Sequence, residues 1–203
     1  MLMAFDRPAY AEVLQSMTVL NDGIGANIAA RALTGSGFPD NLNGTDLVPA
    51  LLADIGIPLR IYLLGAEEAQ LQGAKSAIET AYPMHTVVGT QNGFFDQDET
   101  ASVCEQISAA RPDLLLVAMG NPRQELFIHE NRGRISATVT MGVGALFDFM
   151  SGRVVRAPKM VQNMGLEWLF RFIQEPRRLF RRYIIGIPRF FAIIYRLKRG
   201  ADI

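Results

Sequence analysis

Short apolar runs alternate along the chain with stretches in which apolar residues recur every three or four positions. The runs are rich in Val, Ile and Leu and do not alternate with polar residues, a pattern typical of parallel strands covered on both faces. We expect strands at Met17–Leu20, Arg60–Leu64, Thr86–Val88, Leu114–Met119 and Ala137–Met141. Helices are expected between them, at Ile24–Leu33, Asp46–Ile55, Glu67–Ala81, Asp98–Ala110 and Arg123–Asn131. This alternation predicts a doubly wound, mostly parallel, Rossmann-like α/β sheet.

The pattern changes after Gly152. Gln162–Ile173 and Arg177–Lys198 read as helices, with interruptions near Pro176 and Pro188, and no strand follows them. We therefore expect an α/β domain at residues 1–152 and a helical appendage at residues 153–203.

Charge separates the same two parts. The formal net charge is zero, but residues 1–152 carry 8 Lys/Arg against 17 Asp/Glu, and residues 153–203 carry 12 against 3. A body of net charge −9 with a tail of +9 points to a polyanion or an anionic membrane surface as a partner of the tail.

Compartment signals are few but consistent. The single cysteine, Cys104, cannot form an internal disulfide, which favours a reducing compartment. Met1–Tyr10 has no apolar signal-peptide core, and no window reaches the roughly 20 apolar residues of a spanning helix. The sequence thus predicts a cytoplasmic protein whose contact with a membrane is peripheral.

Candidate chemistry is sought where strands end, because ligands of open parallel sheets bind outside the carboxyl ends of the strands. Asn21, Asp22 and Gly23 follow the first predicted strand. Asp22 could act as a general base, or it could simply cap the helix that begins near Ile24.

Three further corners carry glycine and polar residues. Gly65 could allow a phosphate cradle at a helix start, although Glu67 and Glu68 would repel phosphate, and plain helix initiation is the alternative. Gly120–Glu125 follows a buried strand and resembles a ligand loop. Gly142–Asp148 begins like a dinucleotide fingerprint but has Phe147 at the third glycine position, which disfavours a nucleotide-dependent oxidoreductase or methyltransferase.

Metal and thiol sites have little support. His85 and His129 lie in different segments and form no metal-ligand spacing with Cys104, which we expect to be a packed core thiol. We therefore expect no metal and no resident cofactor.

The tail is basic and apolar at once. Arg177, Arg178, Arg181 and Arg182 are helically spaced, and Ile and Phe residues follow them. This composition is typical of an interfacial membrane helix. A solvated basic face over a core-packed helix is the alternative, and nucleic acid fits less well.

The ordered motifs resemble one family. They are Asp22-Gly23, Gly120-x-Pro122-x-Gln124-Glu125, Gly142-Val143-Gly144 with Asp148, Arg156-Ala157-Pro158, and Glu167–Arg171 with Glu175–Arg178. In this order they resemble the WecG/TagA/CpsF glycosyltransferases from about Ala4 onward.

The resemblance implies an inverting transfer of N-acetylmannosamine or another hexose. The donor would be a UDP-sugar and the acceptor a polyprenyl-diphosphate-linked sugar at the inner membrane face, in surface-polysaccharide synthesis. Asp22 would be the catalytic base, Gln124, Glu125 and Asp148 would lie near uridine, and the tail arginines would meet the diphosphates without a metal. The expected substrate-binding residues are Asn21, Gly23, Asn43, Gly65, Gly120, Pro122, Gln124, Glu125, Gly142, Gly144, Asp148, Arg156, Arg171, Arg177, Arg178 and Arg181.

Two departures accompany the resemblance. Family members usually begin with a further β-α-β stretch, so this chain is expected to start within the helix that follows it. Asp40–Asp46 stands where many members have Arg-x-x-Gly-x-Asp, which implies a different donor or acceptor preference. A non-catalytic membrane or nucleic-acid adaptor is the remaining alternative, and a homo-oligomer is expected from the apolar tail.

Overall fold

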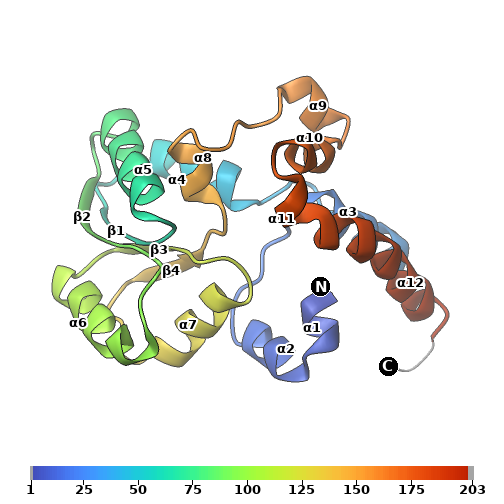
Figure 1. Cartoon of the computed structure of the whole chain (residues 1–203), viewed down its shortest axis with the longest axis horizontal. Helices are drawn as coiled ribbons and strands as arrows, with labels where there is room; N and C mark the ends of the chain where they lie inside the picture. Colours follow the sequence, from blue (N-terminus) through green and yellow to red (C-terminus); the bar gives the residue numbers. More distant parts are fainter. Residues whose placement is uncertain (1, 201–203) are drawn as a thin grey trace. The chain divides into compact units, whose positions relative to one another are not determined.

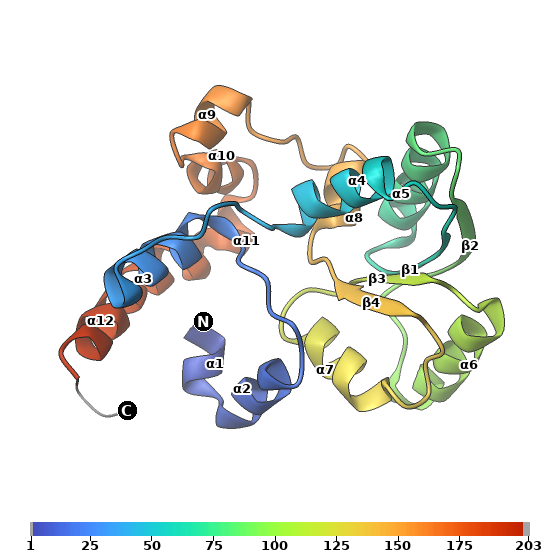
Figure 2. The same ribbon diagram turned by 180° about the vertical axis from the view of Figure 1, so that it is seen from behind.

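The computed structural model describes residues 2–200, except the side chains of residues 163, 178, 181 and 182. Its sheet has four parallel strands in the order β2-β1-β3-β4 (Figures 1 and 2). The strands are β1 (Arg60–Gly65), β2 (Thr86–Gln91), β3 (Leu114–Ala118) and β4 (Val139–Gly142). Four of the five expected strands are therefore confirmed, each with ends that differ by up to three residues.

Helices cover both faces of the sheet, which confirms the doubly wound α/β class (Figure 1). One face packs against α4 (Gly44–Asp54), α5 (Glu68–Ala81) and α8 (Leu146–Met150). The other packs against α6 (Thr100–Ala110), which follows the 3₁₀ turn η1 (Gln97–Glu99), and α7 (Arg123–Asn131).

The core lies on both sides of the two central strands. Leu63 and Leu116 point into the cluster with α4, α5 and α8, whereas Leu64 and Leu115 point into the cluster with α6 and α7. Every residue of β3 is buried, which explains its unbroken apolar sequence. Each such side chain stabilises the fold by about 1.5–3 kcal/mol relative to an exposed one.

The strand expected at Met17–Leu20 was wrong. These residues follow α2 (Pro8–Gln15) as irregular chain, and Val19 is 63% exposed. A short apolar run becomes a strand only where a neighbouring edge pairs with its backbone, and none of the described strands does so here.

The chain divides into two compact units. The sheet unit comprises Arg7–Val19 and Gly44–Val154; the helical unit comprises the described parts of Met1–Asp6, Leu20–Asn43 and Val155–Ile203. The expected assignment of catalysis to residues 1–152 and membrane association to residues 153–203 stays a prediction.

The helical unit is built around α3 (Gly23–Thr34) and α12 (Gly186–Lys198), which lie side by side (Figures 1 and 2). Its other elements are α1 (Leu2–Asp6), α9 (Lys159–Asn163), α10 (Glu167–Gln174), α11 (Pro176–Phe180) and the π-helical turn η2 (Arg181–Ile185). Arg189 of α12 forms a two-pronged ion pair with Asp6 of α1.

One detail of the expected tail helices was wrong. Gln162–Ile173 is not one helix, because Gly165 at φ +71° lies between α9 and α10. The interruption expected near Pro188 is present, because the π-helical turn η2 separates α11 from α12, which begins two residues before Pro188. Within residues 2–200, no helix is both long enough and apolar enough to cross a membrane.

Candidate functional site

The sheet reverses its strand order between β1 and β3. From β1 the chain moves to β2 on one side and then returns to β3 on the other. Ligands of doubly wound sheets bind at such a switch point, outside the carboxyl ends of the strands. The segments that leave these ends are Gly65–Ala66 and Gly120–Pro122, with Gly142–Gly144 following β4. The Asn121–Pro122 peptide is cis.

Position 65 requires glycine, both for its backbone conformation and for its close approach to Ala118 of β3. Its φ is +127°, and a Cβ there would lie 2.4 Å from the carbonyl oxygen of Ala118. That oxygen accepts a 3.0 Å hydrogen bond from the Ala66 N–H. The glycine therefore lets the end of β1 approach β3, and its expected contact with phosphate stays a prediction.

A buried polar network joins the loops after β3 and β4. Oε1 of Glu125 accepts hydrogen bonds from Nε2 of Gln124 at 2.8 Å and from Nδ2 of Asn121 at 2.5 Å. Oε1 of Gln124 in turn accepts the Gly144 N–H at 3.1 Å. Because a Cβ on Gly142 would lie 2.8 Å from Nε2 of Gln124, only glycine fits there without displacing that amide.

Tyr10 joins this network from α2, and sequence reasoning missed it. Its ring is buried, and its hydroxyl lies against Asn121 and Glu125. Burial raises the pKa of Tyr10, and the Glu125 carboxylate raises it further, while Asn121 acts in the opposite direction. The signal in the sequence is the three-residue spacing of Tyr10 and Val13, the two buried residues of α2.

Asp148 lies in the first turn of α8, with its carboxylate mostly covered. Oδ1 is 3.8 Å from Nη1 of Arg153, which is also 3.4 Å from Oε2 of Glu67. Arg153 thus bridges two acids at the edge of the α5–α8 contact. Gln124, Glu125, Gly142 and Gly144 form one connected set, and Asp148 belongs to this second, separate cluster of contacts.

Asp22 occupies the N-cap position of α3 without acting as its cap. Its carboxylate is exposed and makes no capping hydrogen bond. The Gly23 N–H is instead bound by Oδ1 of Asn41 at 2.8 Å. Asn21, directly before Asp22, binds the same loop twice. Its Nδ2 donates to the Asp40 carbonyl at 2.6 Å, and its own carbonyl accepts the Leu42 N–H. The capping interpretation of Asp22 is therefore wrong.

The remaining expected contacts belong to the helical unit. Asn43 is buried. Nε of Arg156 lies 3.6 Å from Oε1 of Glu167, and Nε of Arg171 lies 3.8 Å from Oε2 of Glu175. Arg177 is exposed on α11. The side chains of Arg178, Arg181 and Arg182, which carry much of the expected basic face, lie outside the described residues.

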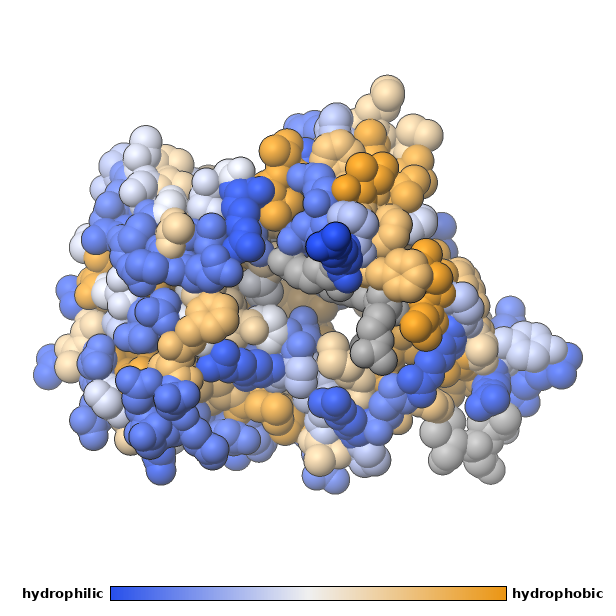
Figure 3. Space-filling model, viewed as in Figure 1, coloured by the Kyte–Doolittle hydropathy of each residue, from blue (hydrophilic) through white to orange (hydrophobic). Residues whose placement is uncertain are grey.

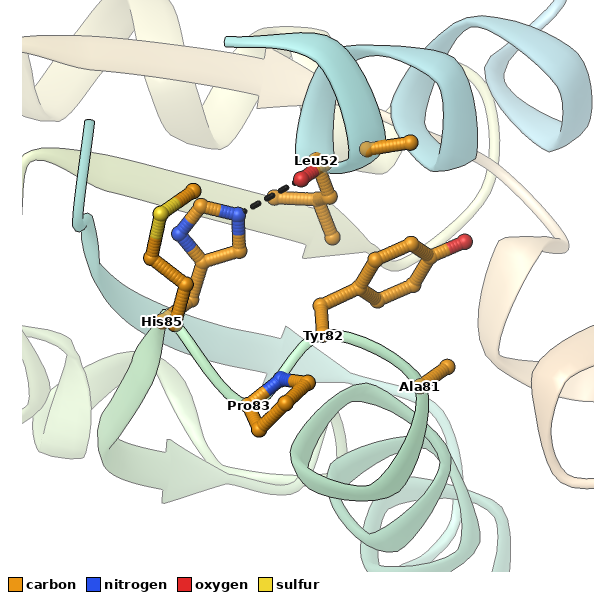
Figure 4. A pocket seen from close by; sticks show the side chains of 7 residues that line it. Leu52, Ala81, Tyr82, Pro83 and His85 are labelled. Carbon is orange, nitrogen blue, oxygen red and sulfur yellow. Dashed lines mark hydrogen bonds between the residues drawn. The ribbon is translucent and has the colours of Figure 1, made fainter. Parts of the chain in front are cut away.

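A shallow pocket lies at the opposite end of the strands, around His85 (Figure 4). Nδ1 of His85 accepts the Leu59 N–H at 3.1 Å, so Nε2 carries the proton and donates to the Leu52 carbonyl at 2.7 Å. His85 therefore ties α4 to the start of β1. The pocket therefore lies beside a structural link between α4 and the sheet, and it is at the far end of the strands from their carboxyl ends.

Metal ligands and reactive thiols do not gather among the described residues. No group of three or more His, Cys, Asp or Glu side chains there could hold a metal ion. Cys104 is buried in the cluster beneath α6, and burial raises its pKa, as expected for a core thiol.

The helical unit exposes large apolar side chains. Met160 and Ile173 are 73% and 71% exposed. Figure 3 shows apolar colour gathered over the region of α9 and α10. Contiguous exposed apolar surface marks interaction sites in soluble domains.

Comparison with known proteins now adds to this geometry. A family model described as "Glycosyl transferase WecG/TagA/CpsF family" matches residues 1–202. The chain belongs to this family. It is 37% identical over 183 residues to a protein of Bacillus subtilis (strain 168), covering 89% of this chain and 70% of that protein. It is 31% identical over 201 residues to a protein of Bacillus spizizenii (strain ATCC 23059 / NRRL B-14472 / W23), covering 98% and 76%.

Both relatives are named N-acetylglucosaminyldiphosphoundecaprenol N-acetyl-beta-D-mannosaminyltransferase. Membership in the WecG/TagA/CpsF family makes this chain a glycosyltransferase. It decides against the oxidoreductase, the methyltransferase and the non-catalytic adaptor that the sequence pattern had left open.

Proposed function

We propose that this glycosyltransferase moves an N-acetylmannosamine-type sugar, or another hexose, from a UDP-sugar to a polyprenyl-diphosphate-linked sugar. The reaction belongs to the synthesis of a cell-surface polysaccharide. The names of the two relatives support the acceptor class and the transferred sugar. The donor nucleotide and the stereochemistry are the further steps of the proposal.

The observation that carries the proposal is the arrangement at the start of α3. A general base must have an accessible carboxylate that is not committed to another hydrogen bond in the fold. Because Asn41 binds the Gly23 N–H, the Asp22 carboxylate is exposed and makes no cap bond. Asp22 can then take the proton of the acceptor hydroxyl as that oxygen attacks the anomeric carbon.

A single displacement inverts the anomeric carbon. The relatives are named beta-D-mannosaminyltransferases, so transfer from a donor whose sugar is α-linked to UDP would have to invert that carbon. One attack by the acceptor hydroxyl forms the new glycosidic bond as the bond to UDP breaks. The pair of electrons leaves with the β-phosphate oxygen of UDP.

The nucleotide half of the donor is assigned to the carboxyl edge of the sheet. Doubly wound folds place nucleotides at the switch point, where backbone N–H groups and small residues allow close approach. Gly120, Gly142 and Gly144 lie on the loops there, and Gln124 with Glu125 fixes the two loops to each other.

The positive charge of residues 153–203 is assigned to phosphate and membrane. Arg177 and the basic residues near it would bind the diphosphate groups of donor, acceptor or lipid. Their positive charge would stabilise the departing UDP without a metal. The exposed apolar residues of the helical unit support peripheral binding to the inner face of the cell membrane, and they leave room for a homo-oligomer. In a flotation assay the chain should float with anionic vesicles and stay behind with zwitterionic ones.

A transfer assay tests the proposal. The chain is supplied with N-acetylglucosaminyl-diphosphoryl-polyprenol and, in separate reactions, with UDP-N-acetylmannosamine, UDP-N-acetylglucosamine or UDP-glucose. We expect a lipid-linked disaccharide from at least one donor, with a β linkage by NMR. The Bacillus subtilis relative is the positive control. Product from that control and none from this chain with any donor would overturn the proposal.

A further inference from the structure

Tyr10 anchors α2 in the sheet unit. It is 6% exposed, whereas Pro8, Ala9 and Glu12 of the same helix face solvent. The ring packs where α2 meets α7, and the hydroxyl reaches Asn121 and Glu125 at the start of α7. A helix of eight residues thereby contacts the loop that leaves β3.

The carboxylate that Tyr10 meets is buried. Glu125 is 8% exposed, and removing a charge from water is costly unless donors surround it. Asn121 and Gln124 both donate to Oε1, but Oε2 is shielded and receives no hydrogen bond of standard geometry from the described residues. The Tyr10 hydroxyl lies close enough to Asn121 and Glu125 for both to affect its pKa, although it makes no hydrogen bond of standard geometry to Oε2.

The same carboxylate sets the orientation of Gln124. Since Glu125 accepts from Nε2, the other end of the amide, Oε1, is turned toward the Gly144 N–H. An amide rotated by half a turn would place its oxygen against the Glu125 carboxylate and its NH2 group against the Gly144 N–H, so only one orientation makes both hydrogen bonds. A disturbance at Glu125 is therefore passed through Gln124 to Gly144.

We propose that Tyr10 is a positioning residue that holds the loops after β3 and β4 in place through Glu125 and Gln124. The importance of those loops for the nucleotide rests on the proposed function, but the positioning itself does not. Without the hydroxyl, the buried carboxylate loses polar contact, the amide of Gln124 loses its fixed orientation, and the Gly144 N–H loses its acceptor for part of the time.

Amide hydrogen exchange at Gly144 in the ligand-free protein measures this directly. In Tyr10→Phe, which keeps the ring, we expect Gly144 to exchange about tenfold faster while Leu116 in the centre of β3 keeps its wild-type rate. A purely structural role would raise both rates together. An unchanged rate at Gly144, or an equal rise at Leu116, would overturn the proposal.

Ser16→Ala is the matched control. Oγ of Ser16 lies 2.8 Å from Nδ1 of His129, so this change also cuts a link from the end of α2 to α7 but touches neither Asn121 nor Glu125. Gly144 should exchange at the wild-type rate in this variant. A rise equal to that in Tyr10→Phe would mean that α2 acts only by docking, against the proposal.

Binding of UDP separates this inference from the proposed function. By calorimetry, Tyr10→Phe should bind UDP about five- to tenfold more weakly than wild type, and Ser16→Ala should bind it equally well. If the wild-type chain binds no UDP, the donor assignment fails, and Gly144 exchange still decides the role of Tyr10.

Discussion

The backbone N–H of Gly23 donates a 2.8 Å hydrogen bond to Oδ1 of Asn41, a residue 18 positions further along the chain. Helix N-termini leave backbone N–H groups without partners inside the helix, and the N-cap side chain normally binds one of them. Here a loop residue does so in place of Asp22. Asn41 therefore accepts the free N–H at the start of α3, and the Asp22 carboxylate is not used for capping.

Asn41 should therefore contribute more to the stability of the fold than Asp22. Asn41→Ala removes the acceptor of the Gly23 N–H and should lower the free energy of unfolding by about 1 kcal/mol. Asp22→Ala should cost less, because its carboxylate makes no capping bond. Urea denaturation of the two variants measures the difference. A larger loss for Asp22→Ala would restore Asp22 as the cap.

Gly142→Ala should damage the network at the carboxyl edge. The added Cβ would lie 2.8 Å from Nε2 of Gln124, whose amide is held by Glu125 and Gly144 and cannot move freely. We expect a loss of about 1–3 kcal/mol in stability and a UDP affinity reduced at least fivefold. Thermal unfolding and calorimetry measure the two effects.

Gly133→Ala is the control for this change, since a Cβ there meets nothing within 4 Å. Its stability should stay within about 0.5 kcal/mol of wild type. Equal behaviour of the two alanine variants would mean that Gly142 has no special role.

His85→Ala should destabilise the sheet unit without affecting ligand binding. The change strips partners from the Leu59 N–H and the Leu52 carbonyl, and each buried group left unpaired costs about 1–3 kcal/mol. Met84→Ala, at a 45% exposed neighbour, should be nearly neutral. A fall in UDP affinity in folded His85→Ala would place the pocket of Figure 4 in the ligand site after all.

Alkaline pH should destabilise the protein. The folded-state pKa values of Tyr10, Tyr62 and Cys104 are all raised, chiefly by burial, from ordinary values of 10.0 for phenols and 9.0 for the thiol. The unfolded chain therefore releases these protons first, and stability must fall as pH rises through about 9 and beyond. Below that range the three groups contribute no pH dependence.

Urea midpoints between pH 7 and pH 11 test this prediction. Tyr10→Phe and Tyr62→Phe should each make the alkaline decline less steep, because each removes one group that must stay protonated in the fold. A stability that rises above pH 9, or declines as steeply in both variants, would contradict it.

Much of the fold could be predicted because burial on both faces leaves a clear mark on a strand. β1 and β3 are continuous apolar runs, and Arg123–Asn131 matches α7 at both ends. Met17–Leu20 shows the same local pattern without forming a strand, because pairing depends on a neighbouring edge that the local sequence does not report. Gly165 ended a helix that apolar spacing alone would have continued.

The site was predictable only in part. The polar residues after β3 and β4 were found from their place at strand ends, and Gln124 and Gly144 indeed contact each other. Tyr10 was missed because its partners lie more than a hundred positions away, and only the packing of α2 on α7 brings them together. The proposed role of Asp22 as a general base came from the ordered motifs, since its local sequence by itself favours a helix cap.

The most direct test of the account compares Asp22→Asn with Asp40→Asn. Both remove one exposed carboxylate from the same part of the chain, and Asp40 contributes its backbone carbonyl, which the substitution keeps. Transfer from the UDP-sugar to the lipid-linked acceptor should fall by about 10²–10⁴-fold in Asp22→Asn, as loss of a general base predicts, with UDP affinity unchanged. Asp40→Asn should transfer at close to the wild-type rate. Wild-type turnover in Asp22→Asn would remove Asp22 from the mechanism and contradict the central claim.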